Sequence, residues 1–115
     1  MVRRGDILWA QLSPRSGSEQ TGRRPVLLFS SDGFNSTPRW NSLIVVPLTT
    51  AIHPQSPTTV YLPKGTANLS RESLVLGHQI TTLDRAKFCA KIGSLAGLYL
   101  EQVERAILRA LAIPG

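Results

Sequence analysis

The segment GSEQTGRRPVLLFS, residues 17–30, joins a polar loop to an apolar strand, and the rest of the chain can be arranged around it. Two glycines bracket the loop, and glycine interrupts regular structure. Residues 25–30, PVLLFS, are apolar enough to form a strand that is buried on both faces. Arg23 and Arg24 therefore lie where a polar loop meets a buried strand.

Short apolar runs on both sides of this segment predict further strands. Pro47 places one strand end at a sheet edge or a bulge, and Gly77 predicts a kink or bulge in a longer strand. One helical turn is expected near residues 68–72, and Asp84 is suited to cap a short helix over residues 85–87. The expected strands are residues 7–12, 43–49, 58–62, 73–83 and 88–95.

The clearest helix is the last element. Leu100, Val103, Ile107 and Leu111 recur on one helical face, and charged residues lie outside that stripe. Its start lacks a good cap because alanine and glycine stand there. Several short strands with one terminal amphipathic helix predict an α+β fold, a small barrel-like sheet with a helix packed on it.

The composition favours one folded domain over residues 1–115. The chain is 42% hydrophobic, and 13 Lys and Arg against 7 Asp and Glu give a formal charge of +6. Such a chain is attracted to polyanions, of which RNA and DNA are the commonest, although many small basic proteins bind nothing specific. A single cysteine, Cys89, excludes an internal disulfide framework, and we expect it to be a small buried residue.

No targeting or membrane segment is indicated. The first apolar run is too short for an export signal and is broken by Asp6 and Gln11. No stretch approaches the ~20 apolar residues of a membrane span. The sequence therefore predicts a soluble, cytoplasmic protein that does not associate with membranes.

Arg23 and Arg24 are the first candidates for function. A guanidinium stays charged at neutral pH and offers a planar fork of donors that fits phosphate. The alternative is a solvated pair or a salt bridge to Glu19. Thr49 and Thr50 end an apolar strand, where their hydroxyls can donate to a phosphate oxygen or cap local backbone.

His78 is the best candidate for proton transfer, because imidazole titrates near neutrality. A lone histidine in a strand is more often structural, and the two histidines of this chain do not form a metal-binding pattern. We therefore expect no metal and no cofactor. Among the aromatic residues, Trp40 in a polar loop is the best candidate for stacking on bases, whereas Trp9 is expected in the core.

Several segments along the chain match those of one protein family. They are RRGDILWAQLSP, GSEQTGRRPVLLFSSDGFN, VVPLTT, GHQITTLD, the KIG segment and the terminal helix. Taken in this order, they resemble the MazF/PemK (Kid) toxins, endoribonucleases of bacterial toxin–antitoxin pairs. The resemblance covers nearly the whole chain, and the GSEQ…RRPV segment followed by VVPLTT at this spacing is specific for the family.

The resemblance implies a CcdB/PemK-like toxin fold, a small SH3-like β-barrel with short helices, normally present as a homodimer. It also implies a sequence-specific, ribosome-independent and metal-independent endoribonuclease that cuts single-stranded RNA. In that reaction the 2′-hydroxyl attacks the adjacent phosphate and yields 2′,3′-cyclic phosphate and 5′-hydroxyl ends. The implied protein partner is a MazE-like acidic antitoxin with a disordered segment that covers the basic RNA groove.

The resemblance also assigns roles to residues. The catalytic arginine falls on Arg24, the strand-end threonine on Thr49, and a candidate acid–base group on His78. Most family members carry Arg where this chain has Thr81, which removes a cation from the implied RNA path. The residues implied in RNA binding are Ser18, Glu19, Gln20, Arg23, Thr50, Gln79 and Thr81.

The sequence leaves two alternatives to an RNA-cleaving toxin open. In the first, the same barrel belongs to a non-catalytic toxin like the gyrase-poisoning CcdB proteins, or to a nucleic-acid- or protein-binding module. In the second, the chain is a family member that has lost its activity, for which Thr81 is the only motivation.

Overall fold

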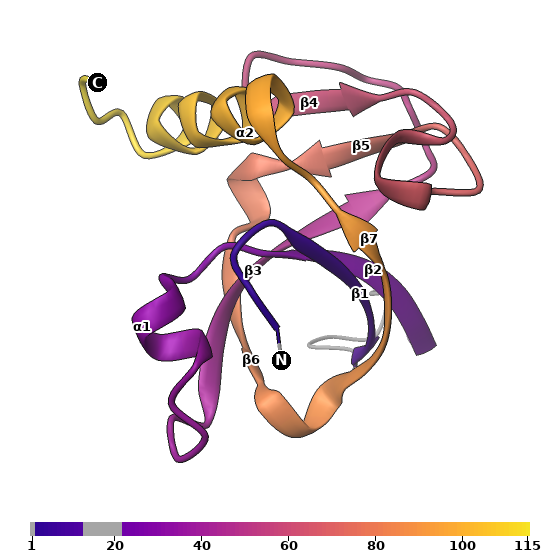
Figure 1. Ribbon diagram of the computed structural model, residues 1–115. Coiled ribbons are helices and arrows are strands. Elements are labelled where there is room, and N and C mark those ends of the chain that lie inside the picture. The colour runs from indigo at the N-terminus through magenta and orange to yellow at the C-terminus, as the bar shows by residue number, and fades with distance from the viewer. Residues whose placement is uncertain (1, 13–21) are drawn as a thin grey trace.

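The computed structural model describes residues 2–12 and 22–115 (Figure 1). Within these residues seven strands form one sheet, in the order β4-β5-β3-β2-β1-β7, with β6 also paired to β3. All the pairs are antiparallel. The strands are β1 (Asp6–Leu12), β2 (Gly22–Leu28), β3 (Ser42–Thr49), β4 (Thr59–Leu62), β5 (Ser73–Leu76), β6 (Thr81–Asp84) and β7 (Phe88–Ser94).

Helices occupy the connections and the end of the chain. The α-helices of the described residues are α1 (Asp32–Asn35) and α2 (Gly97–Ala110), the expected amphipathic helix. Short 3-10 helices are η1 (Thr66–Asn68), η2 (Gly77–Gln79) and η3 (Arg85–Lys87). The α+β class is confirmed. Because the described strand pairs leave the sheet open, the SH3-like barrel stays a prediction.

The strand expected over residues 73–83 is interrupted at Gly77, where η2 separates β5 from β6. These two strands pair with different parts of β3, β6 with residues 42–45 and β5 with residues 48–49. Pro47 lies in the step between them, so its missing N–H donor interrupts neither pairing. The single turn expected at residues 68–72 forms earlier, as η1.

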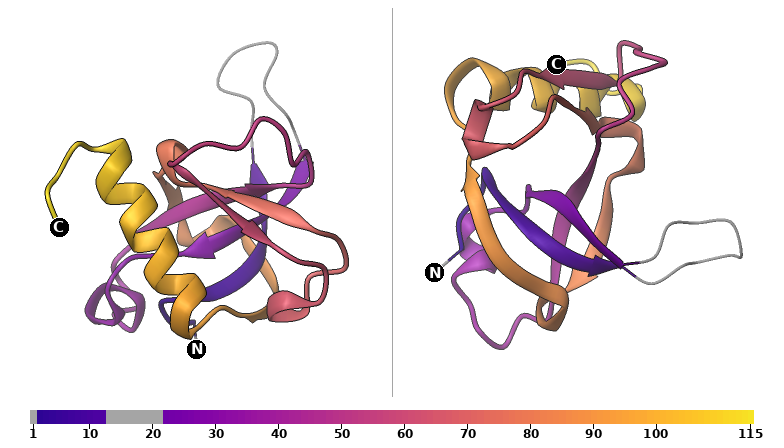
Figure 2. Two further views of the ribbon diagram at one scale, coloured as in Figure 1. Left: turned by 90° about the horizontal axis from the view of Figure 1, so that it is seen from above. Right: turned by 90° about the vertical axis from the view of Figure 1, so that its right-hand side faces the viewer.

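Most of the buried apolar side chains form two clusters, one on each face of the central strands. Leu27 lies in the cluster under α2, whereas Val26 and Leu28 lie in the other cluster. The expectation that this strand is buried on both faces is therefore confirmed. Figure 2 shows α2, β4 and β5 at one end of the molecule, with the curled strands β1, β2 and β7 at the other.

The terminal helix follows the predicted stripe for most of its length. Val103 and Ile107 are buried, but Leu111 lies just past the last turn and is 52% exposed. Ala96 precedes the helix and makes no side-chain cap, as expected. The predicted cap of η3 is confirmed, because the Asp84 carboxylate accepts from the backbone N–H of Ala86 at 2.8 Å.

Candidate active site

Arg24 lies in β2, opposite Ala10 of β1, and its half-buried side chain points toward the end of β3. Its guanidinium donates to the backbone carbonyl of Leu48 at 3.0 Å. Burial lowers the pKa of the Arg24 guanidinium from its ordinary value. An arginine pKa starts so high that the group remains a cation at neutral pH. Arg24 is therefore a charged donor held next to Thr49.

Thr49 ends β3, and its hydroxyl oxygen accepts from the backbone N–H of Ala51 at 3.1 Å. This is the local backbone contact that the sequence left as an alternative. It uses the oxygen as an acceptor, so the hydroxyl hydrogen remains available to a phosphate oxygen. Arg24 and Thr49 together present two donors at one strand end.

A pocket of about 680 Å³ opens in front of these donors. Its lining includes four cations, Arg23, Arg24, Arg71 and Lys91. Hydroxyl and amide groups complete the polar lining, which comes from Thr49, Thr50, Asn68, Ser70 and Ser73. The pocket is the size of ordinary ligand sites, and its cations and neutral donors suit a phosphate-bearing ligand.

Trp9 is half-buried and lines this pocket, so its expected place in the core is wrong. The guanidinium of Arg23 lies over its ring, 5.6 Å from the centroid. In the pairing of β1 with β2, Gln11 opposes Arg23 and Trp9 opposes Pro25. The side chains of Trp9 and Arg23 therefore lie on the same side of the sheet. Arg23 is therefore neither purely solvated nor equivalent to Arg24.

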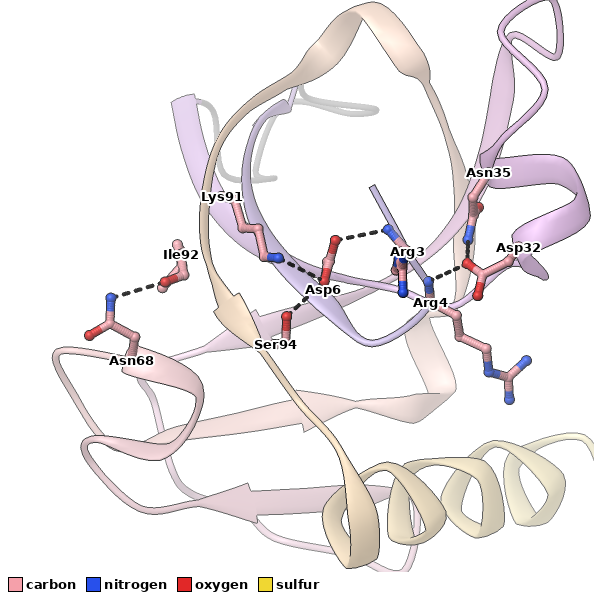
Figure 3. Close-up of polar contacts among 9 residues, drawn as sticks. All are labelled: Arg3, Arg4, Asp6, Asp32, Asn35, Asn68, Lys91, Ile92 and Ser94. Atoms are coloured by element: carbon pink, nitrogen blue, oxygen red, sulfur yellow. Dashed lines mark hydrogen bonds and ion pairs between the residues drawn. The ribbon is translucent and has the colours of Figure 1, made fainter. Parts of the chain in front are cut away.

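Lys91 reaches the pocket from β7 and is held by a buried carboxylate (Figure 3). Its ammonium lies 3.3 Å from Oδ1 of Asp6, a side chain that is only 4% exposed. The same carboxylate accepts from the hydroxyl of Ser94 and from the backbone N–H of Arg3, both at 2.8 Å. Lys91 and Arg71 are not among the residues predicted above, because nothing in the sequence distinguishes a pocket cation from a solvated one.

The other predicted residues are placed elsewhere. Thr81 pairs with Val45, four residues before Thr49, which corresponds to roughly 13 Å along a strand. His78 and Gln79 belong to η2 and do not line the pocket. His78 is exposed, and its Nδ1 lies 3.4 Å from the Thr58 hydroxyl. Ser18, Glu19 and Gln20 fall outside the described residues.

Several remaining candidates lie away from the pocket. Trp40 is 48% exposed and stacks on Phe34, with ring centroids 4.6 Å apart. Cys89 is exposed, so the expectation that it is buried is wrong.

Over residues 2–12 and 22–115, no three His, Cys, Asp or Glu side chains gather closely enough to hold a metal ion. No helix in this part of the chain is long and apolar enough to cross a membrane.

The fold and the pocket together define a small basic α+β protein suited to a phosphate-bearing polymer. Residues 3–111 match the family described as PemK-like, MazF-like toxin of type II toxin–antitoxin systems. The chain belongs to this family, as the sequence motifs indicated.

Named relatives and solved structures agree with this membership. The chain is 32% identical over 111 residues to Endoribonuclease MazF6 of Mycobacterium tuberculosis, covering 96% of this chain and 97% of that protein. The Mycobacterium tuberculosis toxin MazF-mt6 superposes with a TM-score of 0.79 at 23% identity, over 96% of this chain and 99% of that one. A MazF from Deinococcus radiodurans gives 0.78 at 26% identity, over 97% of each chain.

Proposed function

We propose that this protein is a toxin endoribonuclease that cuts single-stranded RNA in the pocket around Arg24 and Thr49. The observation that supports this most directly is the bond between the Arg24 guanidinium and the Leu48 carbonyl, one residue before Thr49. It keeps a permanent cation beside a hydroxyl donor in a pocket with three further cations. Family membership and a relative named as an endoribonuclease support the same activity.

The proposed reaction uses the nucleophile of the substrate. The 2′-hydroxyl loses its proton and attacks the adjacent phosphorus, and the bond from phosphorus to the 5′-oxygen breaks. The products are a 2′,3′-cyclic phosphate and a 5′-oxygen that takes up a proton. Arg24 stabilises the negative charge that develops on the phosphoryl oxygens, and Thr49 donates to one of them. This chemistry requires neither a protein nucleophile nor a metal.

The proposed acid–base residue, His78, does not line the pocket that contains Arg24 and Thr49. His78 is the proposed acid–base group, and direct proton transfer requires its imidazole to come within hydrogen-bond reach of the reacting oxygens. The pH dependence of the cleavage rate of the His78→Ala variant therefore tests whether His78 transfers a proton. A profile unchanged near neutrality would make His78 a structural residue.

The wider proposal follows the family. The whole chain, residues 1–115, acts as one toxin domain of SH3-like barrel type, works as a homodimer and is sequence-specific and ribosome-independent. Its partner is an acidic antitoxin, which the formal charge of +6 favours electrostatically. A solved relative at 21% identity is described as an endoribonuclease in complex with its cognate antitoxin.

The first test is incubation of the purified, antitoxin-free protein with a long mixed-sequence RNA in EDTA. We expect discrete cuts whose downstream fragments carry 5′-hydroxyl ends, because the 5′-oxygen is the leaving group. Folded protein that leaves the RNA intact would falsify the nuclease proposal and favour a non-catalytic binding module.

A further inference from the structure

Arg71 and Lys91 are two pocket cations that the proposed reaction does not use. They come from distant parts of the chain, Arg71 from the segment between η1 and β5 and Lys91 from β7. Both line the pocket that contains Arg24 and Thr49. In the proposed function RNA occupies this pocket, and the following inference rests on that function. It concerns which part of the RNA these two cations bind.

Lys91 is an exposed lysine with a buried ion-pair partner. Its side chain is 51% exposed, yet its ammonium is held 3.3 Å from the buried Asp6 carboxylate. That carboxylate is fixed in turn by Ser94 and by the backbone of Arg3 (Figure 3). An ammonium has three donors, so the contact with Asp6 leaves others for a ligand. Part of the entropy of ordering a lysine side chain is already lost before a ligand binds.

The contact with Asp6 also has an electrostatic consequence. The carboxylate offsets the charge of Lys91 and alone would weaken its attraction for an anion. Arg71 supplies an additional positive charge at the same pocket. Its side chain is exposed, and its guanidinium makes no hydrogen bond or ion pair with any of the described residues. The fork of donors on Arg71 is therefore available to a ligand.

The backbone segments that carry the two cations are tied together. The Asn68 side chain donates to the backbone carbonyl of Ile92 at 3.0 Å, and Figure 3 shows this link between the η1 segment and β7. Gly93 permits the close approach, because a Cβ atom there would collide with the backbone carbonyl of Ala67. Asn68 and Ile92 themselves line the pocket, so the link forms part of its wall.

We infer that Arg71 and Lys91 bind a second phosphate of the RNA, directly adjacent in the strand to the scissile phosphate at Arg24 and Thr49. The pocket is large enough to hold more than a single phosphate group. Two of its cations are held by separate partners, Arg24 by its bond to the Leu48 carbonyl and Lys91 by its contact with Asp6. Gripping two successive phosphates fixes the nucleotide between them and orients its 2′-hydroxyl for attack.

This second site carries no sequence preference of its own. Contacts to phosphate position a nucleic acid, whereas contacts to base edges read its sequence. Loss of Arg71 should therefore weaken the binding of every substrate without moving the cleavage sites. Each phosphate contact also adds about 0.7 to the salt-dependence slope for a single strand, so the slope should fall by about that amount.

The test is a double-mutant cycle on equilibrium binding. The probe is a short RNA around a cleavage site mapped with the wild-type protein, made uncleavable by a 2′-deoxy nucleotide at the attacking position. Two further probes each carry one neutral methylphosphonate, at the phosphate on either side of the scissile one. Arg71→Met should weaken binding of the unmodified probe about tenfold or more. With one of the modified probes, wild-type and variant protein should bind within about twofold of each other.

Arg105→Met is the matched control, because Arg105 is an exposed arginine on α2 that does not line the pocket. Lys91→Met is a second variant, and its melting temperature is measured because Asp6 would lose a partner. Equal binding by Arg71→Met and Arg105→Met, or an unchanged loss with both modified probes, would overturn the second phosphate site. A wild-type protein that cuts no RNA would overturn the proposed function itself.

Discussion

At the scale of single residues, the two adjacent arginines have different environments. Arg24 is half-buried and bonded to the Leu48 carbonyl, whereas Arg23 is exposed and lies over the ring of Trp9. A half-buried guanidinium with one fixed bond keeps its remaining donors in a defined direction, which suits transition-state stabilisation. The cation over an aromatic face is better suited to substrate contact than to chemistry.

Asp32 provides a residue-scale prediction for stability. Its pKa lies below its ordinary value because the Arg4 backbone N–H donates to its carboxylate, and the Asn35 side chain also donates to it. The unfolded chain therefore binds more protons than the folded one between the two pKa values, so stability falls as the pH falls. Between about pH 5 and pH 3, Asp32→Asn should lose less melting temperature than wild type, measured by circular dichroism. Equal losses in both proteins would contradict this assignment.

At the scale of elements, the interruption between β5 and β6 determines how the helix meets the sheet. At η2 the backbone N–H of Gly77 donates to the carbonyl of Thr58 at 2.9 Å. α2 lies against the same turn, with Ala106 next to Gly77. A glycine is needed there because the neighbouring backbone and the helix leave no room for a side chain.

Gly77→Ala tests this packing. The added Cβ would lie 2.6 Å from the Thr58 carbonyl oxygen and 3.3 Å from the Ala106 Cβ, so the backbone must shift. Overpacking of this kind costs about 1–3 kcal/mol, which denaturant unfolding would measure. Gly33→Ala is the control, because its Cβ would meet only the Ser31 hydroxyl at 3.6 Å. Similar stabilities for both variants would show that Gly77 has no such packing role.

The sequence predicted elements better than their connections. Local patterns identified β2, α2 and the Asp84 cap, because a continuous apolar run, helical spacing and capping chemistry each act over a few residues. The sequence did not reveal that residues 73–83 form two strands, which pair with different parts of β3. This division depends on pairing with residues far away in the chain.

The candidate site was predictable in part for the same reason. Arg24 and Thr49 were identified from motifs, and the structure brings both to one pocket. Trp9 was misplaced because an aromatic strand residue looks the same in sequence whether it faces a core or a pocket. Arg71 and Lys91 could not be selected from the sequence, because their position at the pocket depends on contacts of Asp6, Asn68 and other residues far away in the chain.

At the scale of the whole molecule, part of the positive charge gathers at one pocket. Four of the 13 Lys and Arg residues line it, and such a cluster attracts an anionic polymer more strongly than isolated surface cations do. Among these four cations, Arg24 is the one that we propose to contact the scissile phosphate.

The most direct test of this claim is the single-turnover cleavage rate of Arg24→Lys on an RNA with a mapped site, beside Arg105→Lys. Lysine keeps the charge but loses the planar fork, so we expect cleavage to slow by a factor on the order of 10²–10³. Arg105→Lys should cut at the wild-type rate, and both variants should keep the wild-type melting temperature. Cleavage by Arg24→Lys at the wild-type rate would contradict the account.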